Sequence, residues 1–223
     1  DMKLYCLDPQ TGALAWSFET SNYVNATPAI DGPRIIFGGC DGLVHVVSAA
    51  DGKELRSIEV GSYVAAPVAV EDGMAYLGHY GGEVLCVDLE GGSVRWRATP
   101  GSPPEAFMGP PALGAAIMLA GSRDGRLYGL DRKTGVLRWS FRTGGPVDCG
   151  AVVCGDSVVA GSDDGQLYGL ALQDGRKLWS YDVGAPLSTG IAVSADRILV
   201  GAGDGRIYAF GERSAPVPAA TGS

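Results

Sequence analysis

The sequence predicts an all-β fold assembled from repeated four-stranded antiparallel sheets. Three observations carry this prediction: a repeat of about forty residues, glycine-containing turns inside each repeat, and tryptophans confined to one repeat position. The chain has 223 residues, of which 46% are hydrophobic, so it carries enough apolar surface for a substantial core. Its 35 glycines exclude a helical fold, and the absence of a Gly-X-Y period excludes collagen.

The repeat is defined by two landmarks at a fixed distance from each other. The first begins near residues 1, 41, 81, 124, 164 and 204, in steps of 40, 40, 43, 40 and 40 residues. The three extra residues lie in the proline-rich stretch 101–111. The second landmark is a Gly-containing turn followed by a large side chain, which is Trp16, Arg56, Trp96, Trp139 or Trp179. All four tryptophans therefore share one repeat position.

Each unit is predicted to hold four short strands, A to D. In the unit spanning residues 23–58 we expect these strands at 25–30, 34–38, 43–47 and 54–58. Asp41-Gly42 and Asp51-Gly52 separate the last three strands. We expect type I′ turns there, since Asp-Gly is favoured where both central residues need positive φ.

Hydrophobic side chains on consecutive strand positions, as in Ile35-Ile36-Phe37, indicate sheets that are covered on both faces. One position of strand A is repeatedly occupied by proline or glycine: Pro28, Pro67, Pro111, Gly150 and Gly190. Because proline donates no backbone hydrogen bond, strand A is expected at a sheet edge, where it would line a central channel. These features together predict a β-propeller of four-stranded antiparallel blades.

Two segments carry a family resemblance. Leu127-Tyr-Gly-Leu-Asp-Arg-Lys-Thr-Gly-Val-Leu-Arg-Trp139 and Val24-Asn-Ala-Thr-Pro28 resemble the pyrroloquinoline-quinone-like (PQQ-like) repeat, and the resemblance covers residues 1 to about 211. This family includes quinoprotein dehydrogenases, sensor domains attached to kinases, and the non-catalytic outer-membrane assembly lipoprotein. The resemblance implies that Trp16, Trp96, Trp139 and Trp179 are structural residues that wedge between adjacent blades, with Arg56 filling one gap differently.

The blade count predicts that residues 1–211 do not close a ring alone. They supply two strands, then four full units, then three strands. Since family members usually have seven or eight blades, the simplest interpretation is part of a longer propeller, with missing blades from upstream sequence or another chain. The alternative is a compact five-bladed ring in which residues 13–18 supply the missing strand D. Residues 212–223 are predicted to form a flexible C-terminal tail.

The residues needed for quinone chemistry are not recognisable. The resembled dehydrogenases use a vicinal cysteine disulfide, a calcium ion and an Asp base, whereas the five cysteines here form no vicinal pair and no Cys-x-x-Cys motif. The recurring aspartates serve hairpin turns, and His45 and His79 are interpreted as structural. We therefore predict no catalytic, cofactor-binding or metal-binding residue and no cofactor. The alternatives are a PQQ-dependent dehydrogenase, its degenerate relative, or the sensor domain of a larger protein.

The predicted function is a non-catalytic scaffold for protein–protein interaction. The candidate partner-binding rim comprises Tyr23, Tyr63, Glu105, Phe107 and Met108, because the loop that breaks the period carries large apolar side chains. The alternative is that these residues pack against one another. A net charge of −8 argues against nucleic-acid binding, and no apolar run reaches membrane-spanning length. The resemblance implies the cell envelope or periplasm; free cysteines favour the alternative, the cytoplasm.

Overall fold

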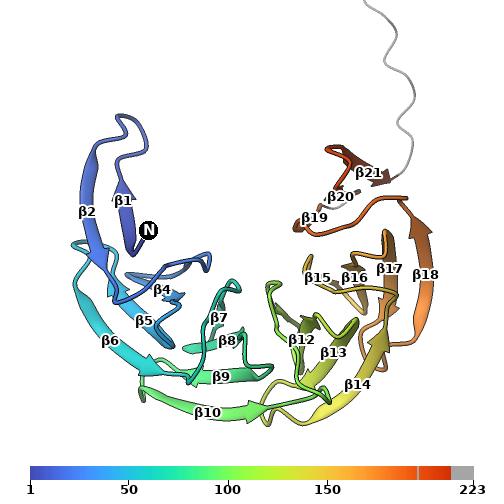
Figure 1. The fold of residues 1–223 in the computed structure, drawn as a ribbon, viewed down its shortest axis with the longest axis horizontal. Helices are drawn as coiled ribbons and strands as arrows, with labels where there is room; N and C mark the ends of the chain where they lie inside the picture. Colours follow the sequence, from blue (N-terminus) through green and yellow to red (C-terminus); the bar gives the residue numbers. More distant parts are fainter. Residues whose placement is uncertain (195, 212–223) are drawn as a thin grey trace, which may run out of the picture.

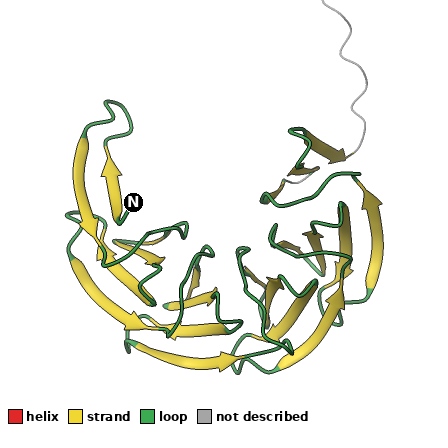
Figure 2. Cartoon of the chain, viewed as in Figure 1, coloured by secondary structure: helices red, strands yellow, loops and turns green. Residues whose placement is uncertain are grey.

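The computed structural model describes residues 1–194 and 196–211, which form an arc of twisted β-sheets (Figure 1). Only strands and loops are present in this part of the chain (Figure 2). It contains no helix that is long and apolar enough to cross a membrane. The prediction of a β-propeller architecture is confirmed, whereas the predicted tail at 212–223 lies outside the described residues.

Four complete antiparallel sheets occupy the middle of the arc. The first contains β3 (Ala29–Asp31), β4 (Arg34–Gly38), β5 (Leu43–Ser48) and β6 (Glu54–Glu59). The second contains β7 (Ala69–Glu71), β8 (Met74–Gly78), β9 (Val84–Asp88) and β10 (Ser93–Ala98). The third contains β11 (Ala112–Leu113), β12 (Ile117–Ser122), β13 (Arg126–Asp131) and β14 (Leu137–Arg142). The fourth contains β15 (Ala151–Cys154), β16 (Ser157–Gly161), β17 (Gln166–Ala171) and β18 (Lys177–Asp182).

Two smaller sheets form the ends of the arc. β1 (Lys3–Leu7) pairs with β2 (Leu14–Glu19), and β19 (Ile191–Val193), β20 (Arg197–Gly201) and β21 (Ile207–Gly211) form a three-stranded sheet. Within the described residues β2 pairs only with β1, and β21 pairs only with β20. The alternative of a five-bladed ring, in which residues 13–18 complete the last sheet, is therefore not what the structure shows.

Strand A is innermost in each blade, and strand D forms the outer edge (Figure 1). The A strands of neighbouring sheets contact one another in the pairs β3 with β7, β11 with β15, and β15 with β19. Strand A is shorter than predicted, since β3 begins at Ala29 and not at residue 25. Pro28 therefore stands just before the strand, because a residue without an N–H cannot donate to the ladder.

The turn chemistry also differs from the prediction. Asp41 does not adopt a positive φ, so Asp41-Gly42 is not a type I′ turn. The Gly39 N–H donates to the Leu43 carbonyl (3.1 Å) and the Gly42 N–H to the Gly39 carbonyl (3.3 Å), which closes a three-residue loop with Gly42 at φ +80°. Such loops place a single glycine in the left-handed region. Asp51-Gly52 likewise belongs to a longer loop, since only its glycine has positive φ.

The hydrophobic core lies between neighbouring sheets. Each of four clusters combines buried side chains from two successive blades; for example, Ile36 and Val44 of one sheet pack with Leu77 and Leu85 of the next. Every residue of β12 is buried, as expected for a sheet covered on both faces. The blades are thus held together by the same apolar contacts that stabilise each sheet.

Candidate functional site

One face of the arc is built from loops that tie each blade to the next. We define the rim as the loops connecting strand D to strand A (residues 20–28, 60–68, 99–111, 143–150 and 183–190) together with the turns between strands B and C. Residues Cys40, Tyr80, Arg123, Asp163 and Gly203 of these turns each donate a backbone N–H to a D–A loop carbonyl, at 2.8–3.0 Å. The matching D–A acceptors are Tyr23, Tyr63, Ala106, Pro146 and Pro186.

The same loops also reach the preceding blade. Val64 donates its N–H to the Gly39 carbonyl at 3.1 Å, and Phe107 donates to the His79 carbonyl at 3.3 Å. Each D–A loop is therefore fixed to both neighbouring blades by backbone hydrogen bonds, which restricts its conformation. A side chain that points outward from such a loop is held in place for a binding partner.

Tyr23 and Tyr63 point outward from the rim. Their side chains are 58% and 56% exposed, although large aromatic side chains are usually buried at least in part. Tyr80 is a third exposed tyrosine, 52% accessible, and its N–H donates to the Tyr63 carbonyl. The sequence interpretation missed Tyr80, although it stands one repeat after Cys40 in the B–C turn. The three residues give this face an aromatic character.

Phe107 is not a surface residue, and its place among the predicted rim residues is wrong. Its side chain is 2% exposed and packs with Tyr76, Met118 and Tyr128. Phe107 holds the position that Val64, Val147 and Leu187 hold in other repeats. The three-residue insertion hides this equivalence, because the loop cannot be aligned without knowing where the extra residues lie.

The other two predicted rim residues of this loop lie at the surface to different degrees. Glu105 is exposed, and its backbone carbonyl accepts a hydrogen bond from the Ser122 hydroxyl at 3.4 Å. Met108 is half-buried. Of these two predicted residues, Glu105 is exposed to solvent, while Met108 exposes only part of its side chain.

Repeated tyrosine–aspartate pairs account for the aspartates of the B–C turns. Tyr168 donates its hydroxyl to Asp164 at 2.6 Å, Tyr208 donates to Asp204 at 2.8 Å, and Tyr128 donates to Asp124 in the same way. Burial, together with the neighbouring Asp164, raises the pKa of Tyr168, so its hydroxyl keeps its proton and remains a donor. These carboxylates are used in the fold, which fits their interpretation as structural.

Both histidines are buried and lie beside carboxylates. His45 replaces the tyrosine of its repeat and stacks on Phe37 with ring centroids 5.1 Å apart. Its two ring nitrogens lie 3.0 Å from Asp41 and 3.2 Å from Glu54. His79 lies 3.0 Å from Glu83 through Nε2, while its Nδ1 accepts the Gly81 N–H. These arrangements anchor the turns and place no imidazole nitrogen toward an open site.

Cysteine and acidic residues form no reactive site in the described part of the chain. All five cysteines are free, and burial raises the pKa of the Cys149 thiol to about 12. A thiol held protonated in this way is a poor nucleophile and a poor metal ligand. Residues 1–194 and 196–211 contain no group of three or more His, Cys, Asp or Glu side chains that could hold a metal ion.

Three tryptophans bridge neighbouring blades. The indole N–H groups of Trp16, Trp96 and Trp139 donate to backbone carbonyls of the following sheet at 3.0–3.1 Å, at Ala49, Arg132 and Leu172 respectively. The Trp139 ring lies so close to Gly175 that a Cβ there would come within 2.4 Å of it. Arg56 lies against Gly92 in the same manner. Trp179 is 40% exposed, and no described residue accepts from its indole N–H.

Comparison with known proteins identifies this architecture. The sequence profile of the family described as outer membrane protein assembly factor BamB matches residues 1–55 and 40–186. The chain belongs to this family of PQQ-like β-propellers. A BamB protein of Nitrosomonas eutropha is 28% identical over 116 residues, which cover 52% of this chain and 27% of that protein. A BamB protein of Burkholderia pseudomallei is 27% identical over 138 residues, covering 60% of this chain and 35% of the relative.

Solved structures show the same fold. The crystal structure of BamB from Moraxella catarrhalis superposes with a TM-score of 0.82 at 20% identity, covering 95% of this chain and 67% of that one. The computationally designed protein Ika8 superposes with a TM-score of 0.78 at 20% identity, covering 91% of this chain and 63% of that one. The alignments with the two BamB sequences span about a third of their lengths or less. These relatives are named as assembly factors, and none of the names describes an enzyme.

Proposed function

We propose that the chain is a non-catalytic scaffold that binds a protein partner through the rim and contributes to the assembly of outer-membrane proteins in the cell envelope. The observation that carries this proposal is the row of exposed tyrosines, Tyr23, Tyr63 and Tyr80, on loops fixed by backbone hydrogen bonds. Tyrosine is enriched where protein interfaces form, because it buries a large ring and keeps one hydroxyl for hydrogen bonding. The family's description as an outer membrane protein assembly factor supports a partner that takes part in that process.

Other features agree with a binding role. A rigid loop loses little conformational entropy on association, so a preformed face of this kind favours binding. The polar side chains that could serve chemistry are engaged in the fold, as the pairing of Tyr168 with Asp164 illustrates. Glu105 and the half-buried Met108 extend the proposed face from the aromatic row to the loop that breaks the repeat.

The test is recovery of partners by a tagged chain expressed in its source cells. After detergent extraction of the envelope, mass spectrometry is expected to find subunits of the outer-membrane protein assembly machinery. The double substitution Tyr63→Ala with Tyr80→Ala removes two aromatic anchors and is expected to lower recovery by about tenfold.

Leu55→Ala is the matched control, because Leu55 is 55% exposed on the outer strand β6, at the end of the strand opposite the rim. It is expected to leave recovery unchanged. Equal recovery by the rim variant and the wild-type chain would contradict the proposal. Circular dichroism of both variants establishes that they are folded.

A further inference from the structure

The third blade carries two arginines that face each other without an acidic partner. Arg126 on β13 and Arg142 on β14 are directly opposite in the strand ladder. Side chains at such positions have Cβ atoms about 5 Å apart, and like charges there repel. Arg126 donates only to the Ser140 hydroxyl, at 3.3 Å, and neither arginine forms an ion pair with a described carboxylate.

Three other sheets place an acid where this blade has Arg142, and the second blade has Thr99 at this repeat position. The acidic residues are Glu19, Glu59 and Asp182, which face Lys3, Leu43 and Gln166 in their ladders. In the first of these pairs Lys3 contacts Glu19 at 3.3 Å. The third blade therefore has two positive charges without an ion pair where three other sheets carry an acid, within a chain of net charge −8.

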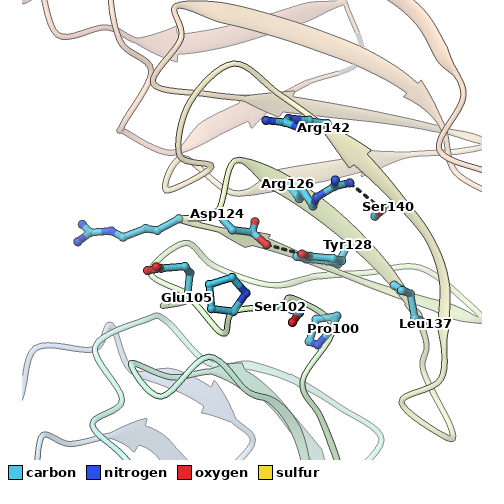
Figure 3. A pocket seen from close by; sticks show the side chains of 11 residues that line it. Pro100, Ser102, Glu105, Asp124, Arg126, Tyr128, Leu137, Ser140 and Arg142 are labelled. Carbon is cyan, nitrogen blue, oxygen red and sulfur yellow. Dashed lines mark hydrogen bonds between the residues drawn. The ribbon is translucent and has the colours of Figure 1, made fainter.

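The two arginines line a cleft between their own blade and the loop that breaks the repeat (Figure 3). Its volume is about 610 Å³, within the roughly 300–1,000 Å³ typical of ligand sites. Pro100, Pro103 and Leu137 give the cleft an apolar wall. The three extra residues of this repeat therefore help to build a cavity beside the unpaired charges.

The inserted loop places the exposed Glu105 on the opposite side of the cleft. Asp124 lies on the same blade as the arginines; it accepts the Tyr128 hydroxyl through one carboxylate oxygen, and its other oxygen is buried without a partner. Arg123 also lines the cleft, but it is already engaged by Asp148, at 2.8 Å. The cleft thus presents two cations without ion pairs on one side and the exposed Glu105 on the other.

We propose that this cleft binds an extended acidic peptide segment of a protein partner, with its carboxylates paired to Arg126 and Arg142. A peptide satisfies both sides of the cleft, because its acidic side chains meet the arginines while its N–H groups donate toward Glu105. A phosphate group carries no such donors and would leave its repulsion by Glu105 uncompensated. The proposal rests on the protein-binding function proposed above and names the chemistry of one part of the partner.

The test measures binding of a short fluorescein-labelled peptide of alternating glutamate and serine to the purified chain by fluorescence anisotropy. Arg142→Glu introduces the acidic residue that three other sheets carry, which lets residue 142 pair with Arg126 and removes the site. Binding is expected to weaken by about tenfold, since a charge-assisted contact is replaced by repulsion. Rising salt is expected to weaken wild-type binding as well.

Arg176→Glu is the matched control, because Arg176 is 68% exposed on a turn of another blade and the change in net charge is the same. It is expected to leave affinity within about twofold, the range of a distant screened charge. Equal loss in both variants, or no peptide binding by the wild-type chain, would overturn the proposal. Binding of phosphatidylglycerol vesicles that depends on Arg142, without peptide binding, would also overturn it in favour of an anionic lipid. Because no cell extract is involved, failure here is separable from failure of partner recovery.

Discussion

Individual carboxylates on the rim experience different environments. Asp164 and Asp204 accept hydrogen bonds from tyrosine hydroxyls, whereas one oxygen of Asp163 is buried without a partner. Burial raises the pKa of Asp163, the neighbouring Asp148 raises it further, and Arg123 opposes this shift. The folded state therefore holds the Asp163 proton more tightly than the unfolded chain does. Ionised Asp163 destabilises the fold at neutral pH. This cost disappears as the pH falls through the raised pKa of the folded state and below the pKa of the unfolded state.

Asp163→Asn is expected to raise the free energy of unfolding at pH 7, because the amide removes a half-buried charge, one oxygen of which is buried without a partner. The gain is expected to shrink as the pH falls, since protonated Asp163 is already neutral in the wild-type chain. Urea unfolding measures the gain in the free energy of unfolding at neutral and at acidic pH. Asp174→Asn, at a position whose side chain is 63% exposed, serves as the control. A gain for Asp163→Asn that is independent of pH would contradict this explanation.

At the scale of single elements, the insertion in the D–A loop at 99–111 obscures which of its side chains is buried. The pattern of strands and turns could be predicted because apolar runs and glycine positions are local signals. The location of Phe107 could not, because two large apolar residues side by side do not reveal which one enters the core. The hydrogen bond from Phe107 to His79 fixes that choice, and it joins residues from two blades.

Phe107→Ala is expected to lower the free energy of unfolding by about 3–5 kcal/mol, since it empties a buried aromatic site. Met108→Ala, at the half-buried neighbour, is expected to cost about 1 kcal/mol or less. Chemical denaturation of the two variants measures the difference. Equal effects would show that Phe107 is no more deeply packed than Met108.

At the scale of the whole molecule, the arc is held together by the contacts between blades. Each core cluster draws on two sheets, and tryptophans add a hydrogen bond from one blade to the backbone of the next. Trp139 lies between two sheets and is 8% exposed, whereas Trp179 is 40% exposed. Tryptophans at the same repeat position therefore contribute differently to the contacts between blades.

Trp139→Ala is expected to cost about 3–5 kcal/mol of unfolding free energy, because a buried indole and its hydrogen bond to Leu172 are lost. Trp179→Ala is expected to cost less than half as much, because a larger part of its ring is already in water. Urea unfolding followed by circular dichroism compares the two variants. Similar losses would indicate that the exposed indole is buried against another part of the protein.

The sequence by itself determined the repeat, the strands and the position of the tryptophans, because these depend on local patterns that recur every forty residues or so. It also contained the charge anomaly at Arg142, which becomes visible once the repeats are aligned with Glu19, Glu59 and Asp182. Only the tertiary structure decided which rim side chains face solvent, as Tyr80 does and Phe107 does not. It also placed Arg126, Arg142 and the inserted loop around one cleft. The reason is physical: exposure and proximity depend on how neighbouring blades pack, and a pattern within one repeat carries no information about the side chains of the next.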